Sequence, residues 1–257
     1  MARLSVVIIT LNEADNIRDC LESVRWADEI VVLDSGSTDG TVSICREYTG
    51  QVHVNANWQG FGAQKNRALT HATGEWVLSL DADERVTGNL RAEIQAALRE
   101  PGRVSAFEIP RLSVFCGREI RHGDWWPDYV ARLFRRTAAR FSDDIVHERL
   151  LFDGHPGRLV NPLSHLAYHS LDQLLEKLNR YTSAGARAMY QKGRRGGIGR
   201  ALTHGLWSFV RAYLFRRGFL DGREGIILAV AGAQSSYYRY LKLMYLEQTI
   251  GTRIDDR

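Results

Sequence analysis

The chain has 257 residues, of which 44% are hydrophobic and 25% are charged, and only five are prolines. These values exclude a disordered, collagen-like or low-complexity protein, and they allow one large domain with an appended segment. The three cysteines are too few and too scattered for a disulfide framework, which indicates a reducing compartment. The first residues lack the cleavage site of a signal peptide, so we expect the fold to begin at once.

The net charge of +4 conceals an uneven distribution of charge along the chain. Residues 1–170 contain 19 basic and 23 acidic residues, whereas residues 171–257 contain 15 basic and 7 acidic ones. The balance is therefore −4 in the first part and +8 in the second. A basic C-terminal region of this kind indicates a partner that is anionic, either a nucleic acid or a membrane surface.

The first part of the chain alternates between two kinds of apolar pattern. Continuous β-branched and apolar runs predict buried strands at residues 4–9, 30–33, 52–54 and 76–80. Apolar residues at helical spacing predict helices around residues 17–24, 42–45, 62–72 and 87–99. This alternation predicts an α/β fold, in which a mostly parallel sheet carries helices on both faces. Ligands bind such sheets at the carboxyl ends of the strands.

Polar and acidic residues follow three of the four predicted strands. The first strand runs into Asn12 and Glu13, the second into Asp34, and the fourth into Asp81 and Asp83. If the last segment is extended, Asp81 and Asp83 point to the same side, and their like charges repel unless a cation lies between them. Paired carboxylates suit Mg²⁺ or Mn²⁺ that carries a diphosphate.

Other strand-end features narrow the class of enzyme. For Asp39 and Glu84, a structural role as N-caps of the helices that follow them is as good an explanation as a role in binding. The chain has no G-x-G-x-x-G after its first strand and no P-loop motif, which disfavours a dinucleotide dehydrogenase and a P-loop NTPase. A nucleotide that is bound by acidic residues and a metal is typical of enzymes that use nucleotide-sugars.

Four segments resemble, in chain order, the nucleotide-binding motifs of family 2 glycosyltransferases. These segments are SVVIITLNEADNI, IVVLDSGSTDGT, GFGAQKNRAL and WVLSLDADE. Later segments, among them RLFRR, IVHERL and LSHLAYHS, resemble the branch that contains the β-glucosyltransferases of the lipopolysaccharide inner core. The resemblance covers nearly the whole chain. It implies a GT-A catalytic domain over residues 1–170, followed by a helical, basic, amphipathic region over residues 171–257.

The resemblance assigns most of the donor site. Asn12 and Glu13 would lie at the uridine pocket, and Asp34 would hydrogen-bond the uracil ring. Lys65 and Asn66 would lie near the ribose and the diphosphate, although a solvated lysine on a helix is an alternative for Lys65.

The resemblance also implies a metal site. Asp81 would approach the ribose and the metal, and Asp83 would ligate a divalent metal, Mg²⁺ or Mn²⁺. His165 fits the position of a histidine ligand beyond the base, with His169 as the second choice. A histidine without a ligand role is an equally good explanation for His165.

A base is needed to take the proton of the acceptor hydroxyl in an inverting displacement. By resemblance, Glu148 is this base. Asp143 and Asp144 are nearby alternatives, and His147 is a weaker candidate for contact with a ligand.

Between the metal motif and the base, aromatic and basic residues occur together. Trp125 and Trp126, with Arg132 and the nearby Arg118 and Arg121, are candidates for an acceptor platform, because rings stack on sugars and arginines pair with phosphates. An equally good interpretation is that one tryptophan belongs to the core and that the arginines cap strand ends.

The C-terminal region begins with a helix whose apolar stripe starts at Leu171 and predicts packing on the catalytic domain. A glycine-rich basic linker follows over residues 191–200. Residues 200–217 then combine a broad apolar face with arginines, which is typical of a helix that lies in a membrane interface. The alternative is a helix packed on the domain or on a second subunit. The longest apolar stretch after it, residues 225–233, is too short to span a bilayer.

Taken together, these features predict an inverting, metal-dependent glycosyltransferase. The resemblance implies a UDP-sugar donor, with UDP-glucose as the best choice, and a lipid-linked saccharide acceptor, an inner-core heptose. The predicted location is the cytoplasmic face of the bacterial inner membrane, as a peripheral protein on an anionic surface. A glycosyltransferase for another envelope polysaccharide is a second interpretation. A basic nucleic-acid-binding protein is a third, but the acidic strand ends would repel nucleic acid, and we predict no such partner.

Overall fold

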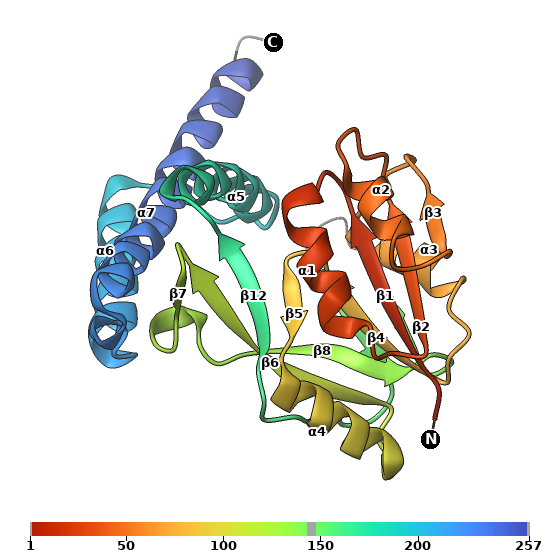
Figure 1. The fold of residues 1–257 in the computed structure, drawn as a ribbon. Coiled ribbons are helices and arrows are strands. Elements are labelled where there is room, and N and C mark those ends of the chain that lie inside the picture. The colour runs from red at the N-terminus through yellow and green to blue at the C-terminus, as the bar shows by residue number, and fades with distance from the viewer. Residues whose placement is uncertain (1, 143–147, 256–257) are drawn as a thin grey trace. The chain divides into compact units, whose positions relative to one another are not determined.

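The computed structural model describes residues 2–142 and 148–255. The chain divides into two compact units (Figure 1). The sheet unit consists of Met1–Leu112 and Asp128–His165, and the helical unit consists of Ser113–Pro127 and Leu166–Arg257. The chain passes between the units three times, and the third passage lies between His165 and Leu166. Residues 113–127, however, belong to the helical unit, which the sequence did not indicate.

The first four strands of the sheet unit match the predicted ones and run parallel. They are β1 (Leu4–Thr10), β2 (Glu29–Asp34), β3 (Val52–Val54) and β4 (Trp76–Asp81). Strand β1 lies between β2 and β4, and β3 pairs with β2. In this register Asp34 is the partner of Thr10, and Asp81 is the partner of Ile9. The carboxyl ends of these strands therefore meet at one edge, as predicted.

Six later strands extend the sheet, in the order β3-β2-β1-β4-β8-β6-β12-β5, with β7 and β11 paired to β6. Their bounds are Glu84–Val86 for β5, Ala106–Phe115 for β6, Arg118–Glu119 for β7, Asp128–Arg135 for β8, Gly157–Arg158 for β11 and Leu163–Tyr168 for β12. Strand β8 is antiparallel to β4 and β6, so the sheet is mixed. A separate two-stranded sheet consists of β9 (Ala139–Phe141) and β10 (Leu150–Phe152).

Helices cover both faces of the parallel strands. The helices of the sheet unit are α1 (Ala14–Val24), α2 (Thr41–Arg46), α3 (Phe61–Leu69) and α4 (Gly88–Arg99). Alternate residues of β1 enter two separate cores, because successive side chains of a strand point to opposite faces. Val6 and Ile8 pack with apolar residues of α1 and α4, whereas Val7 and Ile9 pack with Ala68 of α3.

The helical unit contains α5 (Leu171–Gln191), α6 (Ile198–Val210), α7 (Gly222–Asp255) and three short elements. The short elements are η1 (Gly123–Trp125), the π-helical turn η2 (Arg211–Phe215) and η3 (Gly218–Asp221). Phe115 and Ile120, from the β6–β7 hairpin, share a core with Leu174 of α5 and Leu228 of α7. This shared core explains why residues 113–127 join the C-terminal helices.

Helix α6 buries its small residues and exposes its large apolar ones. Ala201, Gly205 and Ser208 are buried, and a Cβ atom on Gly205 would lie 3.3 Å from the backbone oxygen of Ala233 on α7. The exposed large residues of this segment and the two elements after it are Ile198, Leu202, Leu206, Trp207, Leu214, Phe215, Phe219 and Leu220. Close packing by small residues therefore leaves the predicted apolar face exposed. In the part of the chain that the structure describes, no helix is long and apolar enough to cross a bilayer.

Candidate active site

The loops after β1 and β2 are joined by polar strand-end residues. The buried carboxylate of Asp34 accepts hydrogen bonds from the backbone N–H groups of Gly36 (2.9 Å) and Ser37 (2.8 Å). Asn12, with a positive φ of 54°, accepts a bond from the N–H of Thr38 (2.8 Å) through its Oδ1. These bonds fix the loops at the edge where the uridine pocket was predicted. Contact of Asn12 or Asp34 with a nucleotide remains a prediction.

Glu13 and Asp39 lie at the starts of two helices. Asp39 accepts hydrogen bonds from the first N–H groups of α1 (Ala14, 3.2 Å) and α2 (Thr41, 3.0 Å), although the N-cap residue of α2 is Gly40 and not Asp39, contrary to one interpretation of the sequence. Burial raises the pKa of Glu13, and the nearby carboxylates of Asp83 and Asp39 add to this effect. The Glu13 carboxylate itself accepts a hydrogen bond from Asn16 Nδ2 (2.8 Å).

Five charged side chains form a compact group, which we call the ion cluster: Lys65, Asp81, Glu84, Arg132 and Glu148. The Lys65 Nζ lies 3.0 Å from Asp81 Oδ1 and 2.8 Å from Glu148 Oε1. Arg132 Nη2 contacts Asp81 Oδ2 and lies 2.7 Å from Glu84 Oε1. Lys65 is only 2% exposed, so it is not a solvated surface lysine. The structure thus brings Lys65, Asp81 and Glu148 together, although they are far apart in sequence.

The cations of the ion cluster affect the protonation of Asp81 and Glu84. Burial acts to raise the pKa of Asp81, but the cations of Arg132 and Lys65 overcome this effect and hold it well below its usual range. Burial raises the pKa of Glu84, which the neighbouring Arg132 only partly offsets. Asp81 is consequently a permanent anion that is already paired with two cations.

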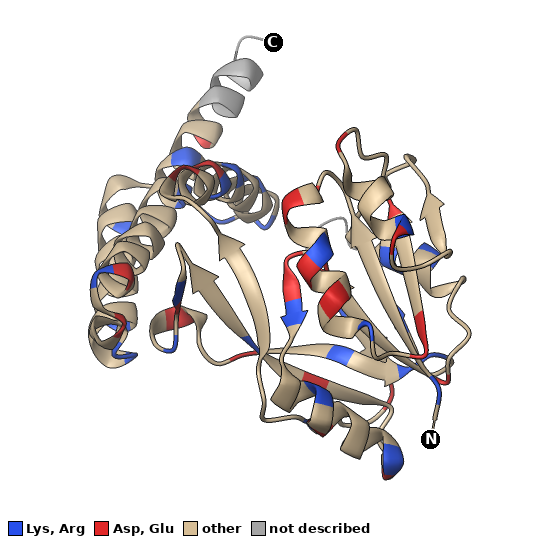
Figure 2. Ribbon diagram, in the orientation of Figure 1, with Lys and Arg blue, Asp and Glu red and all other residues tan. Residues whose placement is uncertain are grey.

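Glu84 is not the N-cap of α4, contrary to one interpretation of the sequence. It lies in β5, fully buried, and its Oε2 accepts a hydrogen bond from the N–H of Asp81 (3.0 Å). Thr87 caps α4 instead, by accepting a bond from the N–H of Leu90 (3.2 Å). Figure 2 shows acidic and basic residues adjacent on β5. Sequence reasoning missed the role of Glu84, because its partner Arg132 lies on β8 and no local pattern connects the two.

Asp83 does not lie on the same extended strand as Asp81. Residues 82 and 83 form a turn between β4 and β5, so the expectation of an extended segment is wrong at this point. Asp83 Oδ2 instead lies 3.3 Å from His165 Nε2 on β12. The antiparallel pairing of β12 with β5 places His165 opposite Glu84 and so beside this turn.

Asp83 and His165 fit a divalent metal as two protein ligands. Among the described side chains, no group of three or more His, Cys, Asp or Glu residues is arranged around one point. Mg²⁺ is commonly held by one or two carboxylates together with phosphate oxygens and water, so two protein ligands are enough when a diphosphate is bound. Their role as metal ligands remains a prediction.

Asn66 has a structural contact that accounts for its amide. Its Nδ2 donates to the backbone oxygen of Phe141 (2.9 Å), and its Oδ1 accepts from the N–H of the same residue (2.8 Å). These bonds use one of the two N–H donors and one of the two acceptor sites of the amide, and contact of Asn66 with a ribose or diphosphate remains a prediction. The pair joins α3 to β9, close to the segment that carries Glu148.

The structure separates the three predicted acceptor residues between the units. Trp125 and Trp126 belong to the helical unit, where Trp125 packs against Tyr168 with ring centroids 5.7 Å apart. Arg132 belongs to the sheet unit and is held by two carboxylates of the ion cluster. The alternative of a packed tryptophan and structurally paired arginines therefore has direct support, and the acceptor platform remains a prediction.

The remaining candidates are the second choice of histidine ligand, His169, and the alternatives for the base. The backbone N–H of His169 donates to Gln173 Oε1 (2.9 Å) at the start of α5, in the helical unit. Asp143, Asp144 and His147 lie outside the described residues, so the alternatives for the base remain open.

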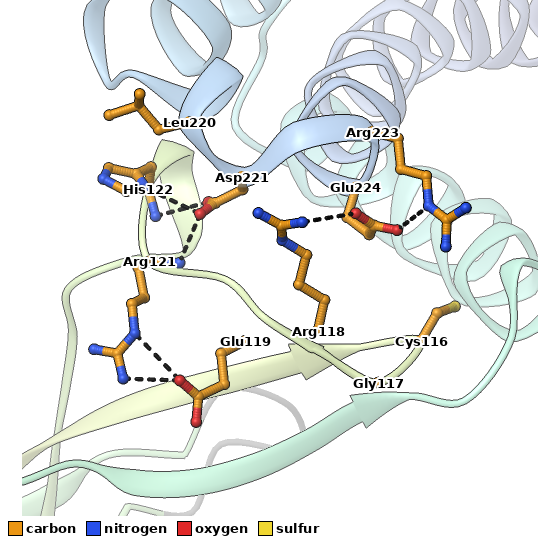
Figure 3. A pocket seen from close by; sticks show the side chains of 10 residues that line it. All are labelled: Cys116, Gly117, Arg118, Glu119, Arg121, His122, Leu220, Asp221, Arg223 and Glu224. Carbon is orange, nitrogen blue, oxygen red and sulfur yellow. Dashed lines mark hydrogen bonds and ion pairs between the residues drawn. The ribbon is translucent and has the colours of Figure 1, made fainter.

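A pocket of about 750 Å³ lies in the helical unit, between the β6–β7 hairpin and the start of α7 (Figure 3). Its charged side chains are paired with one another. His122 Nδ1 lies 2.9 Å from Asp221 Oδ1, and Arg118 lies 3.7 Å from Glu224. Because these charges compensate one another, the pocket has no unpaired cation for an anionic ligand among the residues that Figure 3 labels.

A mixed sheet whose parallel strands carry acidic side chains at their carboxyl edge, in a sequence without a glycine-rich phosphate loop, agrees with the GT-A fold that the motifs predict. The family model of glycosyl transferase family 2 matches residues 5–153. The chain therefore belongs to glycosyl transferase family 2, as its motifs predict, and it is a glycosyltransferase.

The chain is similar to several known proteins. An uncharacterized glycosyltransferase of Rickettsia prowazekii is 31% identical over 256 residues, which cover 95% of this chain and 87% of that protein. The lipopolysaccharide core biosynthesis glycosyltransferase LpsC of Rhizobium meliloti is 29% identical over 247 residues, covering 93% and 91%. The crystal structure of residues 1–349 of TarS from S. aureus matches with 16% identity and a TM-score of 0.48, covering 97% and 92%.

Proposed function

We propose that the chain transfers a glucosyl group from UDP-glucose to a heptose of the lipopolysaccharide inner core, with inversion at the anomeric carbon. The observation that carries this proposal is the position of Glu148 in the ion cluster, joined through Lys65 to Asp81 at the donor edge of the sheet. The name of LpsC, as a lipopolysaccharide core glycosyltransferase, supports the choice of acceptor.

In this proposal the donor lies across the carboxyl ends of β1, β2 and β4. Asn12, Glu13 and Asp34 contact the uridine, and Asp81 contacts the ribose. Asp83 and His165 hold Mg²⁺ or Mn²⁺. When bound, the metal neutralises the charge that develops on the leaving diphosphate.

Glu148 accepts the proton of the attacking acceptor hydroxyl. A carboxylate can do so only if it is ionised and correctly directed. Lys65 serves to direct it, because its buried ammonium group lies 2.8 Å from Glu148 Oε1. Inversion in one displacement requires the base on the side opposite to the leaving group. Lys65, which contacts Asp81 on one side and Glu148 on the other, marks the division between the donor and the acceptor sides.

Turnover with a panel of UDP-sugars and a truncated core saccharide tests this function. We expect UDP-glucose to be the best donor, and Glu148→Gln to lower kcat by roughly 10²–10⁴ while leaving donor affinity nearly unchanged. Glu75→Gln, at an exposed carboxylate, is the control. Full activity of Glu148→Gln would refute the assignment of the base. Preference for another donor or another envelope saccharide would support the second interpretation of the sequence.

We further propose that the helical unit binds the cytoplasmic surface of the inner membrane. The exposed apolar residues of α6, η2 and η3 form one continuous chain segment, in which Leu206 is 67% and Trp207 is 53% exposed. Arg211, Arg216 and Arg217 lie in or directly after η2, and anionic lipid headgroups attract such side chains. An exposed apolar face with adjoining arginines is typical of an interfacial anchor. This attachment would bring the enzyme to a lipid-linked acceptor.

A further inference from the structure

We propose that Trp58 and Phe61 form a platform that holds a pyranose ring of the acceptor saccharide. This inference rests on the proposed function and adds a sugar subsite to it. The two rings meet edge to face, with centroids 4.8 Å apart and planes at 90°. Trp58 is 44% and Phe61 is 43% exposed, so much of each ring remains accessible. Single exposed apolar residues are common on protein surfaces, but that background does not explain two large rings in contact, Trp58 just before α3 and Phe61 at its first residue.

The loop that carries the rings is held in place on both sides. Arg67 donates to the backbone oxygen of Asn57 and to the side chain of Gln59. Gln64, which is buried, donates to Ser35 Oγ (2.9 Å) and so attaches α3 to the loop after β2. A surface whose side chains are fixed before binding loses less entropy when a ligand arrives. The loop is therefore built as a rigid support for the exposed rings.

The platform lies beside the proposed base. Gly62 follows Phe61, and a Cβ atom there would lie 1.9 Å from the backbone oxygen of Ser142 and 3.4 Å from Glu148 Cβ. Phe61 also precedes Lys65 by one helical turn, so both lie on the same side of α3. The acceptor hydroxyl must reach Glu148 to lose its proton. A saccharide with a hydroxyl at Glu148 thus has its adjoining rings near Phe61 and Trp58.

The chemistry of the rings matches a sugar. One face of a pyranose carries C–H groups, which pack against the electron-rich face of an indole or phenyl ring. The loop that carries Trp58 also adjoins the loop of Asp34, because the backbone N–H of Asn55 donates to the backbone oxygen of Asp34 (2.8 Å). The closeness of the start of α3 to Glu148 is therefore what favours the acceptor saccharide as the occupant, over the hexose or the uracil of the donor.

Steady-state kinetics with UDP-glucose and a truncated core saccharide tests the platform. We expect Trp58→Ala and Phe61→Ala each to raise the KM for the acceptor by roughly tenfold, with the KM for UDP-glucose and the acceptor-free hydrolysis of UDP-glucose unchanged. Trp58→Phe, which keeps a ring, should restore most of the acceptor affinity. Val54→Ala is the matched control, because Val54 is exposed at the end of β3 but has no ring.

The outcomes separate the platform from the proposed function. If the wild-type chain neither hydrolyses nor transfers from any UDP-sugar, the proposed function fails. If the wild type is active and the acceptor KM of both alanine variants equals that of Val54→Ala, the platform is refuted. A rise in the KM for UDP-glucose alone would place the donor on the rings and would also overturn the inference. Melting temperatures near that of the wild type verify that the variants are folded.

Discussion

Removal of the Lys65 charge tests the ion cluster most directly. Lys65→Met keeps the length and the apolar stem of the side chain but deletes the cation that contacts Asp81 and Glu148. Asp81 retains Arg132 as a partner, so the main consequence is a nearly buried Glu148 carboxylate that has lost its ammonium partner.

The burial of the ion pair sets how much Lys65→Met lowers the free energy of unfolding. Breaking a buried ion pair by removing one partner costs about 3–5 kcal/mol. Because the side chains of Asp81 and Glu148 are 33% and 16% exposed, water compensates part of the loss, and we expect the lower end, about 3 kcal/mol. Lys65→Arg, which keeps the charge, should lower the free energy of unfolding much less than Lys65→Met does.

A double-mutant cycle isolates the pair. Lys65→Met, Glu148→Gln and the double variant are compared by urea unfolding, with hydrogen exchange of the β1 and β4 amides to assign the transition to the sheet unit. Removing both charges leaves no unpaired carboxylate at position 148. The double variant should therefore be more stable than the sum of the single losses predicts, with a coupling of about 1–3 kcal/mol. Additivity within about 0.5 kcal/mol would refute the view that Lys65 stabilises the charge on Glu148.

Three further predictions concern the metal, acid stability and the membrane. Asp83→Asn should abolish metal-dependent turnover, because an amide is a poorer ligand for a hard cation than a carboxylate; Mn²⁺ titration measures it. Burial acts to raise the pKa of Glu29, but hydrogen bonds from three neighbours lower it from 4.5 to about 2. Its stabilisation of up to about 3 kcal/mol is present above pH 4.5 and is lost as the pH falls towards 2, so Glu29→Gln should flatten the acid limb of the free energy of unfolding. Replacing Arg211, Arg216 and Arg217 together by Gln should weaken attachment to anionic vesicles by about 3 kcal/mol in co-sedimentation.

Each of these predictions has a contrary outcome. Wild-type activity in excess chelator contradicts the metal assignment, and an unchanged acid limb in Glu29→Gln contradicts the role of its hydrogen bonds. Asp124 pairs with Arg211 (2.6 Å) and Arg216 (3.1 Å), so Asp124→Asn loses these ion pairs but keeps both arginines. It should bind vesicles at least as tightly as the wild type. If the triple variant instead loses activity on a soluble acceptor, the segment supports catalysis and the membrane proposal is wrong.

Local pattern alone predicted the parallel part of the sheet and its polar edge. The strands at residues 4–9, 30–33 and 76–80 were recognisable because a strand that is buried on both faces is apolar along its whole length. The strand at residues 52–54 was also predicted, but it is short and only partly buried. The grouping of Asp34 and Asp81 at one edge followed, since parallel strands end on the same side. The large apolar residues of residues 200–217 were also recognised as a distinct face.

Tertiary structure decided which partner each polar group meets. A two-residue turn directs Asp83 to His165, whereas Asp81 faces Lys65 and Arg132. The pairing of Glu84 with Arg132 joins positions 48 residues apart on different strands. Likewise, small residues at the contact between α6 and α7 decide that the large apolar face of α6 is exposed. Apolar periodicity is a property of neighbouring residues and can be read locally, whereas charge pairing and helix orientation depend on contacts that form only when distant segments pack.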